Sequence, residues 1–595
     1  MQELIQRLQQ HVLQGFAELF GQSPDPKAIQ LQKTRKEFTG DYTINVFPFL
    51  KLSRKSPPET AQMLGEYLQR EMPEVTGFEV IKGFLNVSLS DVWWLSQLQA
   101  IEGNAQFGQF PSSGKTVLVE YSSPNTNKPL HLGHLRNIFL GDAVSSVLEA
   151  NGHNVVRTQI INDRGIHICK SMLAWKRFGK GETPASSGIK GDHLVGKYYV
   201  RFDQAYKEEV RGLVEAGRSE EEAKNEAPIL QEARAMLRAW EAGDPEVQEL
   251  WKTMNGWVYE GFDLTYATMR VAFDKLYYES DTYLLGRDEV EKGLEAGVFY
   301  RKEDGSIWVD LESEGLDHKL LLRADGTAVY MTQDIGTALL RYRDYPGLGQ
   351  LIYTVGNEQE YHFKVLFLIL QKLGFEWAKE CFHLSYGMVE LPEGRMKSRE
   401  GTVVDADDLM EEMTRAALEE GGQHGTFDDL DVEAQQVLAG QIGLAALKYF
   451  ILRVDPKKKM VFNPEESIDL NGNTGPFIQY TYARIRSLER KAEELGASAV
   501  AYAEVKLDPR ERELIRWLAD FPQAVQEAGT QYSPAILANY TYDLVKLYNS
   551  FYQSLSIFQA ESETMRDFRL VLSSVTARVI RTAMETLGMQ VPERM

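Results

Sequence analysis

Two histidines one helical turn apart are the residues whose types and spacing most directly suggest chemistry. His131 and His134 flank Gly133 at the start of an expected helix, after the polar stretch 121–129. Side chains three positions apart share a helical face, so both imidazoles can donate hydrogen bonds to a phosphoryl group as charge builds during displacement. The alternative is that both are ordinary cap or core residues. No acidic or cysteine ligand lies near them on this helix, so we predict no metal site.

The elements around these histidines indicate where a ligand binds. Residues 117–121 are typical of a buried strand, 131–150 of a helix, 155–161 of a second strand and 165–178 of a second helix. This alternation predicts a parallel, doubly wound, Rossmann-like sheet, in which ligands bind beyond the carboxyl ends of the strands. A helix N-terminus there suits phosphate, and Gly133 would let a ligand approach closely.

The rest of the chain divides into three expected domains. Residues 1–112 form a small α+β unit, with a helix at 4–19, a helix at 57–72 capped by Ser56, and a strand pair at 78–89 turning at 82–83. Residues 113–404 carry the sheet, which a long, charged, helical insertion splits at about 180–320. The strands resume at 320–323, 328–332, 351–355 and 383–389. Residues 405–595 form a helical bundle, with helices expected at 434–453, 475–495, 509–527, 534–554 and 566–587.

Composition limits the classes of protein that this chain can be. With 595 residues and 43% apolar content, it can bury several cores, and its two cysteines fit a reducing cytoplasm better than a disulfide framework. The sequence has no signal peptide and no apolar run long enough to span a membrane. The net charge of −21 argues weakly against a nucleic-acid partner, but basic clusters at 51–55, 457–459 and 484–491 allow a local footprint. Each cluster has a solvated face as its alternative.

One phosphate-binding pattern is rejected. Residues 191–197 match most of a P-loop, yet Tyr198 stands where a serine or threonine would bind Mg²⁺. No apolar strand precedes Gly191, so we interpret the match as coincidence.

The His131-Leu-Gly-His134 segment resembles the HIGH signature of class I aminoacyl-tRNA synthetases. The resemblance extends along nearly the whole chain and is specific to the arginyl family. The similar segments are SSPNTNKP at 122–129, NDRG at 162–165, DGTAVYMTQD at 325–334, GNEQEYHF at 356–363, YGMV at 386–389, RMKSREGT at 395–402 and GPFIQY at 475–480 with Arg484. Each segment alone is weak; their order and spacing together are specific.

This resemblance implies an arginine pocket and an ATP site. Arginine's planar cation needs carboxylate and planar acceptors. By resemblance, Asn125 binds the backbone side of the amino acid, and Tyr330 and Asp334 bind its guanidinium. The remaining residues implied for arginine are Glu120, Ser122 and Gln359, and those implied for ATP are His131, Gly133, His134, Met388 and Val389.

The loop at 395–401 resembles the second class I signature, KMSKS, which brings cations to the departing pyrophosphate. The sequence departs from the common form, because Ser398 stands where the second lysine belongs. The resemblance implies that Lys128, just before the first signature, compensates. The division of work among Lys128, Lys397 and Arg399 stays open.

Aromatic and basic side chains indicate where RNA would bind. Unstacked bases are commonly read by aromatic stacking and by arginine. By resemblance, Phe477, Tyr480 and Arg484 contact the anticodon loop, with Met595, Tyr540 and Tyr548 as further candidates, and Phe84 contacts the outer corner of the tRNA. Core packing is the alternative for about half of the aromatic residues.

The resemblance implies an arginine–tRNA ligase that acts in the cytoplasm. We expect arginine, ATP with Mg²⁺ and tRNA(Arg) as substrates, activation that requires bound tRNA, no tightly bound cofactor, no membrane partner and a monomer. Three alternatives are weighed. A cysteinyl or glutaminyl synthetase is one, although a cysteinyl enzyme would want more cysteines than Cys169 and Cys381. A small-molecule nucleotidyltransferase would be much shorter, and a non-catalytic RNA-binding relative would have lost the histidines or the pocket acids.

Overall fold

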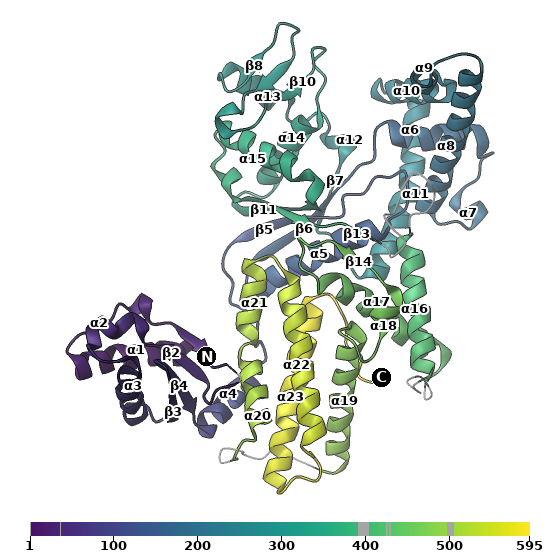
Figure 1. The fold of residues 1–595 in the computed structure, drawn as a ribbon. Coiled ribbons are helices and arrows are strands. Elements are labelled where there is room, and N and C mark those ends of the chain that lie inside the picture. Colours follow the sequence, from purple (N-terminus) through teal and green to yellow (C-terminus); the bar gives the residue numbers. More distant parts are fainter. Residues whose placement is uncertain (1, 36, 391–403, 424–426, 428–429, 497–504) are drawn as a thin grey trace.

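A five-stranded parallel sheet lies at the centre of the molecule, between two lobes above it and a helical bundle below it (Figure 1). The computed structural model describes residues 2–35, 37–390, 404–423, 427, 430–496 and 505–595. The N-terminal unit lies beside the helical bundle and contacts it through helices α4 (Asp91–Gly103) and α20 (Pro509–Ala519). The expected fold class, α+β followed by a parallel α/β sheet and a helical C-terminal part, is confirmed.

The N-terminal unit packs helices against a four-stranded antiparallel sheet. Its helices include α1 (Gln2–Phe20) and α3 (Pro57–Glu71), and its strands, in spatial order, are β1 (Leu31–Lys33), β2 (Tyr42–Asn45), β4 (Phe84–Leu89) and β3 (Val75–Ile81). The Ser56 hydroxyl caps α3 by accepting the N–H of Glu59, as the sequence predicts. Strands β3 and β4 turn at Lys82 and Gly83, whose φ angles of 53° and 105° are those a tight hairpin requires.

The central sheet brings its first strand to the middle. Its strands, in spatial order, are β12 (Cys381–Tyr386), β11 (Leu348–Gly356), β5 (Thr116–Glu120), β6 (Asn154–Ile161) and β7 (Lys275–Tyr278). The chain leaves β5 toward β6 on one side, and β11 returns on the other side. The carboxyl end of β5 is therefore a switch point in the strand order, where doubly wound sheets bind their ligands.

The expected insertion at 180–320 is wholly helical only in its first part, since strands β7, β8 (Tyr300–Arg301) and β9 (Ile307–Val309) alternate with short helices in the rest. Helices α8 (Gly191–Glu215), α10 (Pro228–Glu241) and α11 (Pro245–Met269) form the first part. Strand β7 then returns to the central sheet beside β6. The prediction missed β7 because Lys275-Leu-Tyr-Tyr278 is short and partly exposed at the sheet edge, so it has no continuous apolar run.

Two strand predictions after the insertion are also corrected. Residues 319–322 form β10 (Lys319–Leu322), but this strand pairs antiparallel with β9 (Ile307–Val309) in a separate three-stranded sheet. Residues 328–332 do not form a strand, because helix α14 (Tyr330–Asp344) begins there. A short apolar run does not distinguish a strand from the first turn of a buried helix.

The P-loop-like segment lies at the start of α8 and is helical. A Cβ at Gly191 would lie 1.9 Å from the carbonyl oxygen of Trp257, so this glycine allows α8 to approach α11 closely. Packing therefore explains Gly191 without a phosphate.

The C-terminal part is helical, as expected. Its main helices are α16 (Ala406–Gln423), α17 (Val432–Leu452), α19 (Gly475–Glu494), α20, α21 (Phe521–Thr530), α22 (Pro534–Ser554) and α23 (Glu563–Thr586). The single helix expected at 509–527 is two helices. Pro522, which has no N–H to donate, lies in the first turn of α21, so the helix restarts at Phe521.

Helix α5 (Leu132–Ala150) joins the sheet to the C-terminal bundle. Most of its 19 residues are buried, and α16, α17, α21, α22 and α23 all contact it. A helix that is buried on nearly every face is part of a core. The two histidines thus begin a helix that the C-terminal helices hold in place. Across the described residues, no helix combines the length and apolar character that a membrane crossing requires.

Candidate active site

Backbone contacts fix the proton positions of the two signature histidines. Gly133 N–H donates to Nδ1 of His131 at 3.2 Å, and His131 N–H donates to Nδ1 of His134 at 3.1 Å. In a neutral imidazole, the nitrogen that accepts a hydrogen bond carries no proton, so the proton of each ring lies on Nε2. The ring centres are 3.9 Å apart. The helix start therefore presents two neighbouring Nε2–H donors.

Both histidines are neutral at physiological pH. Burial lowers the pKa of His131 to about 4, and the nearby positive charge of Lys128 adds to this shift. Burial also lowers the pKa of His134 well below its usual value. A neutral donor can stabilise negative charge without first losing a proton, and it costs less to desolvate than an imidazolium ion.

A cavity of about 220 Å³ lies beside His131 and is lined by Lys128, Leu130, His193, Lys197, Tyr199 and Asp405, among others. Burial lowers the pKa of the Lys128 ammonium. The lysine that the sequence predicts as a phosphate contact is thus held at the mouth of the α5 N-terminus. The lining thus contains a neutral donor and cationic donors, together with the carboxylate of Asp405.

The chain that follows the second signature runs beside the first signature. Lys397, Ser398 and Arg399 lie outside the described residues. Just after them, the Leu132 N–H donates to Val404 O at 3.1 Å, and the Ala406 N–H donates to Leu130 O at 3.0 Å. The two signature regions are therefore joined by backbone hydrogen bonds.

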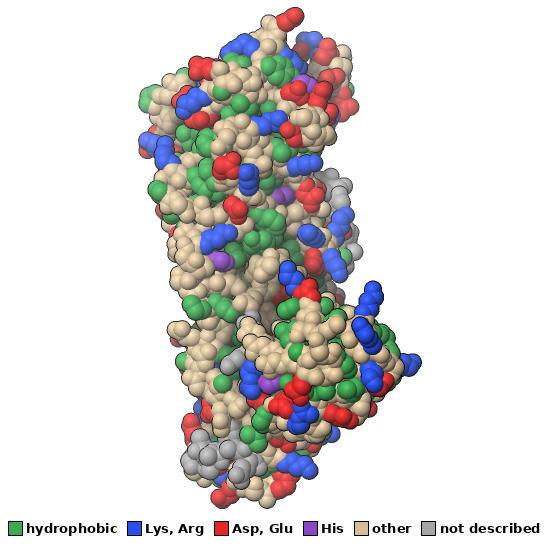
Figure 2. Space-filling view, turned by 90° about the vertical axis from the view of Figure 1, so that its left-hand side faces the viewer, with side chains coloured by type: hydrophobic (Ala, Val, Ile, Leu, Met, Phe, Trp, Pro, Cys, Tyr) green, Lys and Arg blue, Asp and Glu red, His purple; other side chains and the backbone are tan. Residues whose placement is uncertain are grey.

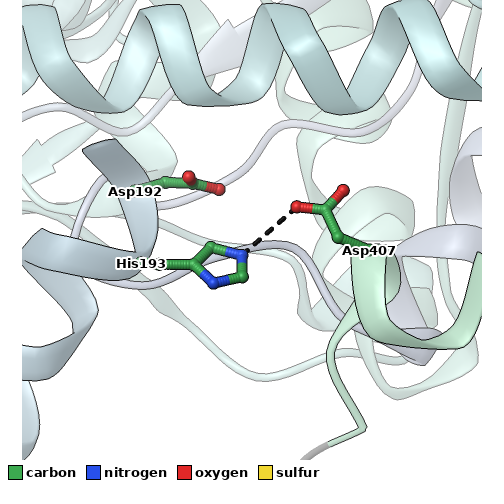
Figure 3. A group of neighbouring side chains, drawn as sticks. All are labelled: Asp192, His193 and Asp407. Atoms are coloured by element: carbon green, nitrogen blue, oxygen red, sulfur yellow. Dashed lines mark hydrogen bonds and ion pairs between the residues drawn. The ribbon is translucent and has the colours of Figure 1, made fainter. Parts of the chain in front are cut away.

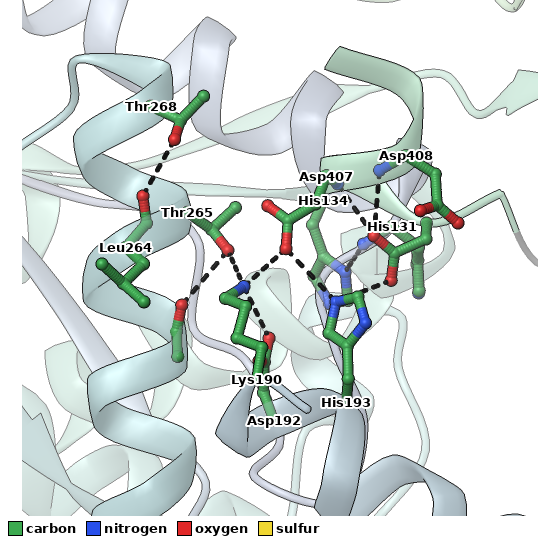
Figure 4. A network of polar contacts seen from close by, with 12 residues as sticks. His131, His134, Lys190, Asp192, His193, Leu264, Thr265, Thr268, Asp407 and Asp408 are labelled. Carbon is green, nitrogen blue, oxygen red and sulfur yellow. Dashed lines mark hydrogen bonds and ion pairs between the residues drawn. The ribbon is translucent and has the colours of Figure 1, made fainter. Parts of the chain in front are cut away.

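An ion-pair network from α8 holds this junction. Nε2 of His193 lies 3.2 Å from an Asp407 oxygen, and Asp192 lies nearby (Figure 3). These three side chains could hold a metal ion. However, the Lys190 ammonium lies 2.5 Å from Asp407 and 3.2 Å from Asp192, between the two carboxylates (Figure 4). Lys190 supplies the positive charge that a cation would, so we interpret the group as a structural network that the sequence analysis missed.

The predicted arginine pocket lies where β5, α14 and β11 meet. Glu120 ends β5 and is buried, and its carboxylate pairs with the guanidinium of Arg341 from α14. Tyr330 and Asp334 lie one turn apart at the start of α14, and the Tyr330 side chain is 78% exposed. Gln359 is exposed in the short turn after β11. The structure brings these residues to the same end of the sheet.

Asp334 already has a partner in the protein. Nε2 of His362, from helix α15 (Glu360–Lys372), lies 2.6 Å from an Asp334 oxygen. The sequence analysis named neither His362 nor Arg341 as a site residue. His362 lies inside the quoted segment 356–363, so that segment carried a signal; nothing in the sequence around Arg341 did.

Two further pocket residues lie on the loop after β5. The Ser122 hydroxyl is buried against the hydroxyl of Tyr266 at 2.6 Å, and Ser122 N–H donates to Oδ1 of Asn137 at 2.5 Å. Asn125 is exposed and forms a bridge with Asn162. Ser122 therefore shapes the loop, whereas Asn125 is accessible to a ligand.

The predicted ATP contacts Met388 and Val389 lie beyond β12. Val389 begins the short strand β13 (Val389–Glu390), which pairs with Met460 in β14 (Met460–Val461). Met388 accepts the N–H of Met460 at 3.2 Å. Backbone pairing with β14 therefore holds both predicted ATP contacts in place.

The candidate anticodon residues lie on one side of α19. Tyr480 is 37% exposed, and the Arg484 guanidinium stacks over its ring at 4.9 Å. Phe477 is half-buried against Tyr542, with ring centres 5.8 Å apart. Met595 is partly buried at the end of the tail, which is held to α19 because Gln479 donates to the backbone of Gln590 at 2.7 Å.

Two of the further aromatic candidates are core residues. Tyr540 and Tyr548 are buried, and their hydroxyls donate to Trp517 O and to the Ser573 hydroxyl. Both lie on the face of α22 that packs against other helices, so the alternative of core packing describes these two residues.

Phe84 lies on the surface of the N-terminal unit. Its exposed ring makes an edge contact with the exposed ring of Phe47, with ring centres 5.6 Å apart. Exposed basic residues lie close to these rings in the sequence. Lys51, Arg54 and Lys55 follow Phe47, and Lys82 precedes Phe84. Figure 2 shows Lys and Arg side chains gathered along one edge of this unit. An aromatic pair beside basic side chains suits an RNA surface despite the acidic total charge.

Sequence comparisons match most of the chain to known families. Residues 97–463 match the family of class I tRNA synthetases (R), catalytic domain; residues 478–595 match the DALR anticodon binding domain; and residues 6–89 match the arginyl tRNA synthetase N terminal domain. The chain is 58% identical to the arginine–tRNA ligase of Bacteroides thetaiotaomicron over 588 residues, or 98% of each chain. It is 54% identical to that of Porphyromonas gingivalis over 596 residues, or 100% of each chain.

Solved structures agree as well. The arginyl-tRNA synthetase of Thermus thermophilus superposes with a TM-score of 0.78 at 26% identity, over 99% of this chain and 100% of that one. The enzyme of Plasmodium falciparum gives 0.73 at 20% identity over 99% of each chain, which bears on the fold alone. The parallel sheet and the histidine pair at its switch point are those of a class I aminoacyl-tRNA synthetase. Within that class, the chain belongs to the arginyl-tRNA synthetase family.

Proposed function

We propose that this chain is an arginine–tRNA ligase, which activates arginine with ATP and transfers it to tRNA(Arg). The observation that carries the proposal is the 58% identity to an arginine–tRNA ligase over nearly the full length. The geometry supports it, since acidic side chains and neutral donors meet at the switch point of the sheet.

In the first step, the arginine carboxylate attacks the α-phosphorus of ATP, and pyrophosphate leaves. The Nε2–H groups of His131 and His134 donate to the phosphoryl oxygens as negative charge builds, and Lys128 attracts the departing phosphates. Mg²⁺ enters as the ATP complex. Lys397 and Arg399 share this role in our proposal. No covalent protein intermediate is needed, so the catalytic effect comes from position and electrostatics.

In the second step, the 2′-hydroxyl of the terminal adenosine attacks the carbonyl carbon of the adenylate, and AMP leaves. We assign residues 1–112 to the outer corner of the tRNA, 113–404 to catalysis and 405–595 to the stem and anticodon. Phe84, Phe477, Tyr480, Arg484 and Met595 are the proposed RNA contacts. We further propose that activation requires bound tRNA, and that the protein acts as a cytoplasmic monomer.

The test is arginine-dependent exchange of pyrophosphate into ATP, with and without tRNA, using lysine, cysteine and glutamine as controls. Of the four amino acids, we expect only arginine to support exchange, and only when tRNA is present. Exchange with arginine in the absence of tRNA would still support an arginine–tRNA ligase, but it would contradict the proposal that activation requires bound tRNA. No exchange with any amino acid, together with tight tRNA binding, would favour a non-catalytic RNA-binding protein.

A further inference from the structure

The carboxylate at the end of β5 has a buried arginine partner. Glu120 and Arg341 form an ion pair in which the side chains are 9% and 1% exposed. The Arg341 guanidinium lies 5.4 Å from the ring centres of both Tyr277 and Tyr353, from β7 and β11. Arg341 therefore lies beneath the predicted arginine pocket, out of reach of solvent.

Burial works against the charge of Glu120. Taking a carboxylate out of water favours its protonated form, and burial raises the pKa of Glu120. The positive charge of Arg341 opposes this shift, while the negative charge of Asp334 adds to it. A protonated Glu120 would bind a cationic side chain far more weakly than the carboxylate does. The contribution of Glu120 to a pocket for a cationic amino acid therefore depends on Arg341.

The other groups that face the pair carry no compensating positive charge. Ser123, from the loop after β5, is within hydrogen-bonding distance of Glu120. Burial raises the pKa of Tyr277, of Tyr353 and of Cys381 from β12, so these three groups are neutral at physiological pH. Of the described groups that act on Glu120 here, Arg341 is the cation.

We propose that Arg341 is a positioning residue for arginine recognition, which keeps Glu120 ionised and fixed so that its remaining lone pairs accept the substrate. The proposal rests on the proposed function, because it requires arginine as the substrate. Arg341 itself touches neither substrate nor ATP in this scheme. Asp334, whose partner His362 is only partly buried, stays open to exchange that partner for the substrate guanidinium.

The test compares the KM for arginine as a function of pH in four proteins: wild type, Arg341→Met, Arg341→Lys and the double variant Glu120→Gln/Arg341→Met. In Arg341→Met, burial acts on Glu120 without the opposing charge of Arg341, so its pKa rises further. Each pH unit by which its pKa exceeds the assay pH lowers the ionised fraction about 10-fold. We expect its KM for arginine at pH 7 to be at least about 10-fold above wild type and to fall as pH rises, by up to about 10-fold per pH unit.

The other variants separate position from packing. The double variant keeps the pair neutral and has no carboxylate to titrate, so its KM for arginine should be high and independent of pH. Arg341→Lys keeps the charge, so it should remain closer to wild type at pH 7 even if Arg341→Met folds poorly. The KM for ATP should be unchanged in every variant that folds.

Two results would overturn the inference. One is an unchanged KM for arginine in Arg341→Met; the other is a KM that is raised equally at every pH, which a purely structural role predicts. These results differ from the result expected if the proposed function itself is wrong. In that case the wild-type protein would show no arginine-dependent exchange at all.

Discussion

At the scale of single residues, the two signature histidines act through a fixed tautomer. Backbone N–H groups donate to both Nδ1 atoms, so the proton of each neutral ring stays on Nε2. The histidine pair caps α5 and, in our proposal, also stabilises the transition state. From the sequence, the alternative is that the histidines are ordinary helix caps. In our proposal they are caps and also contact the phosphoryl oxygens.

Removal of one donor gives the first prediction. His134→Ala should lower kcat for arginine activation by about 10²–10³-fold, as loss of an oxyanion donor does, and change the KM for arginine little. Pyrophosphate exchange at saturating substrate measures it. His153→Ala is the matched control, because His153 bonds to Ser113 away from the site. A loss below about threefold would mean that His134 only caps the helix.

The charge of Asp334 gives a second prediction. Asp334→Asn keeps the shape but removes the charge-assisted hydrogen bond, which is worth about 1.5–3 kcal/mol. We expect the KM for arginine to rise about 10- to 150-fold with a smaller effect on the KM for ATP. Asp288→Asn, at an exposed position on α13 (Arg287–Glu295), is the control. Equal changes in both KM values would contradict a role in the arginine pocket.

The sequence suggested candidate site residues that belong to contiguous segments, and it did not suggest the partners that distant segments supply. His131, Lys128 and Asp334 belong to recognisable segments, so the chain itself displays them. Arg341 and His193 matter because folding brings them to Glu120 and Asp407, across more than 200 residues. Spacing along a chain carries no signal for such partners.

At the scale of elements, a buried ion pair joins α20 to α23. The Arg569 guanidinium donates to Glu511 at 2.8 Å, and the two side chains are almost fully buried. Removing one partner leaves an uncompensated charge inside the protein, which costs about 3–5 kcal/mol. The pair therefore fixes how these two helices meet.

Arg569→Met should lower the free energy of unfolding of the helical bundle by about 3–5 kcal/mol, and Glu511→Leu/Arg569→Met should recover most of it. Thermal unfolding of the full chain, followed by circular dichroism, measures both. The surface variant Arg510→Met, in the facing helix α20, controls for loss of an exposed arginine outside the buried pair. A double variant that is no more stable than the single one would refute the account.

Elements with explicit end signals were predicted well. Ser56 marks the start of α3, and Pro534 lies at the first turn of α22, where the predicted helix begins. Edge strand β7 was missed because its neighbours, rather than its own residues, stabilise it. Helices α20 and α21 were predicted as one helix because the apolar periodicity continues across Asp520. Pro522, in the first turn of α21, is what divides the helix in two.

At the scale of the whole molecule, a net charge of −21 must coexist with an RNA partner in our proposal. Local basic surfaces then carry the attraction, and the acidic remainder discourages non-specific binding. The edge of the N-terminal unit in Figure 2 is one such surface.

Lys51→Gln should therefore weaken tRNA binding at every salt concentration. If Lys51 contacts a phosphate, the slope of log K against log salt should become shallower by about 1. Lys379→Gln is the control, because Lys379 lies on the catalytic domain and pairs with Glu376. An unchanged slope would remove Lys51 from the RNA surface, and the test uses filter binding from low to physiological salt.

Helix α5 has a practical consequence for anyone who wishes to produce the catalytic part alone. Five C-terminal helices contact α5, and Lys448 of α17 lies over the buried ring of Phe139, so apolar surface of α5 would face water if residues 405–595 were absent. Exposed apolar patches of this kind promote aggregation. We expect residues 1–404 to accumulate in inclusion bodies, and co-expression with a separate 405–595 chain to return both to the supernatant. The catalytic part would then behave less as a module than as half of a shared core.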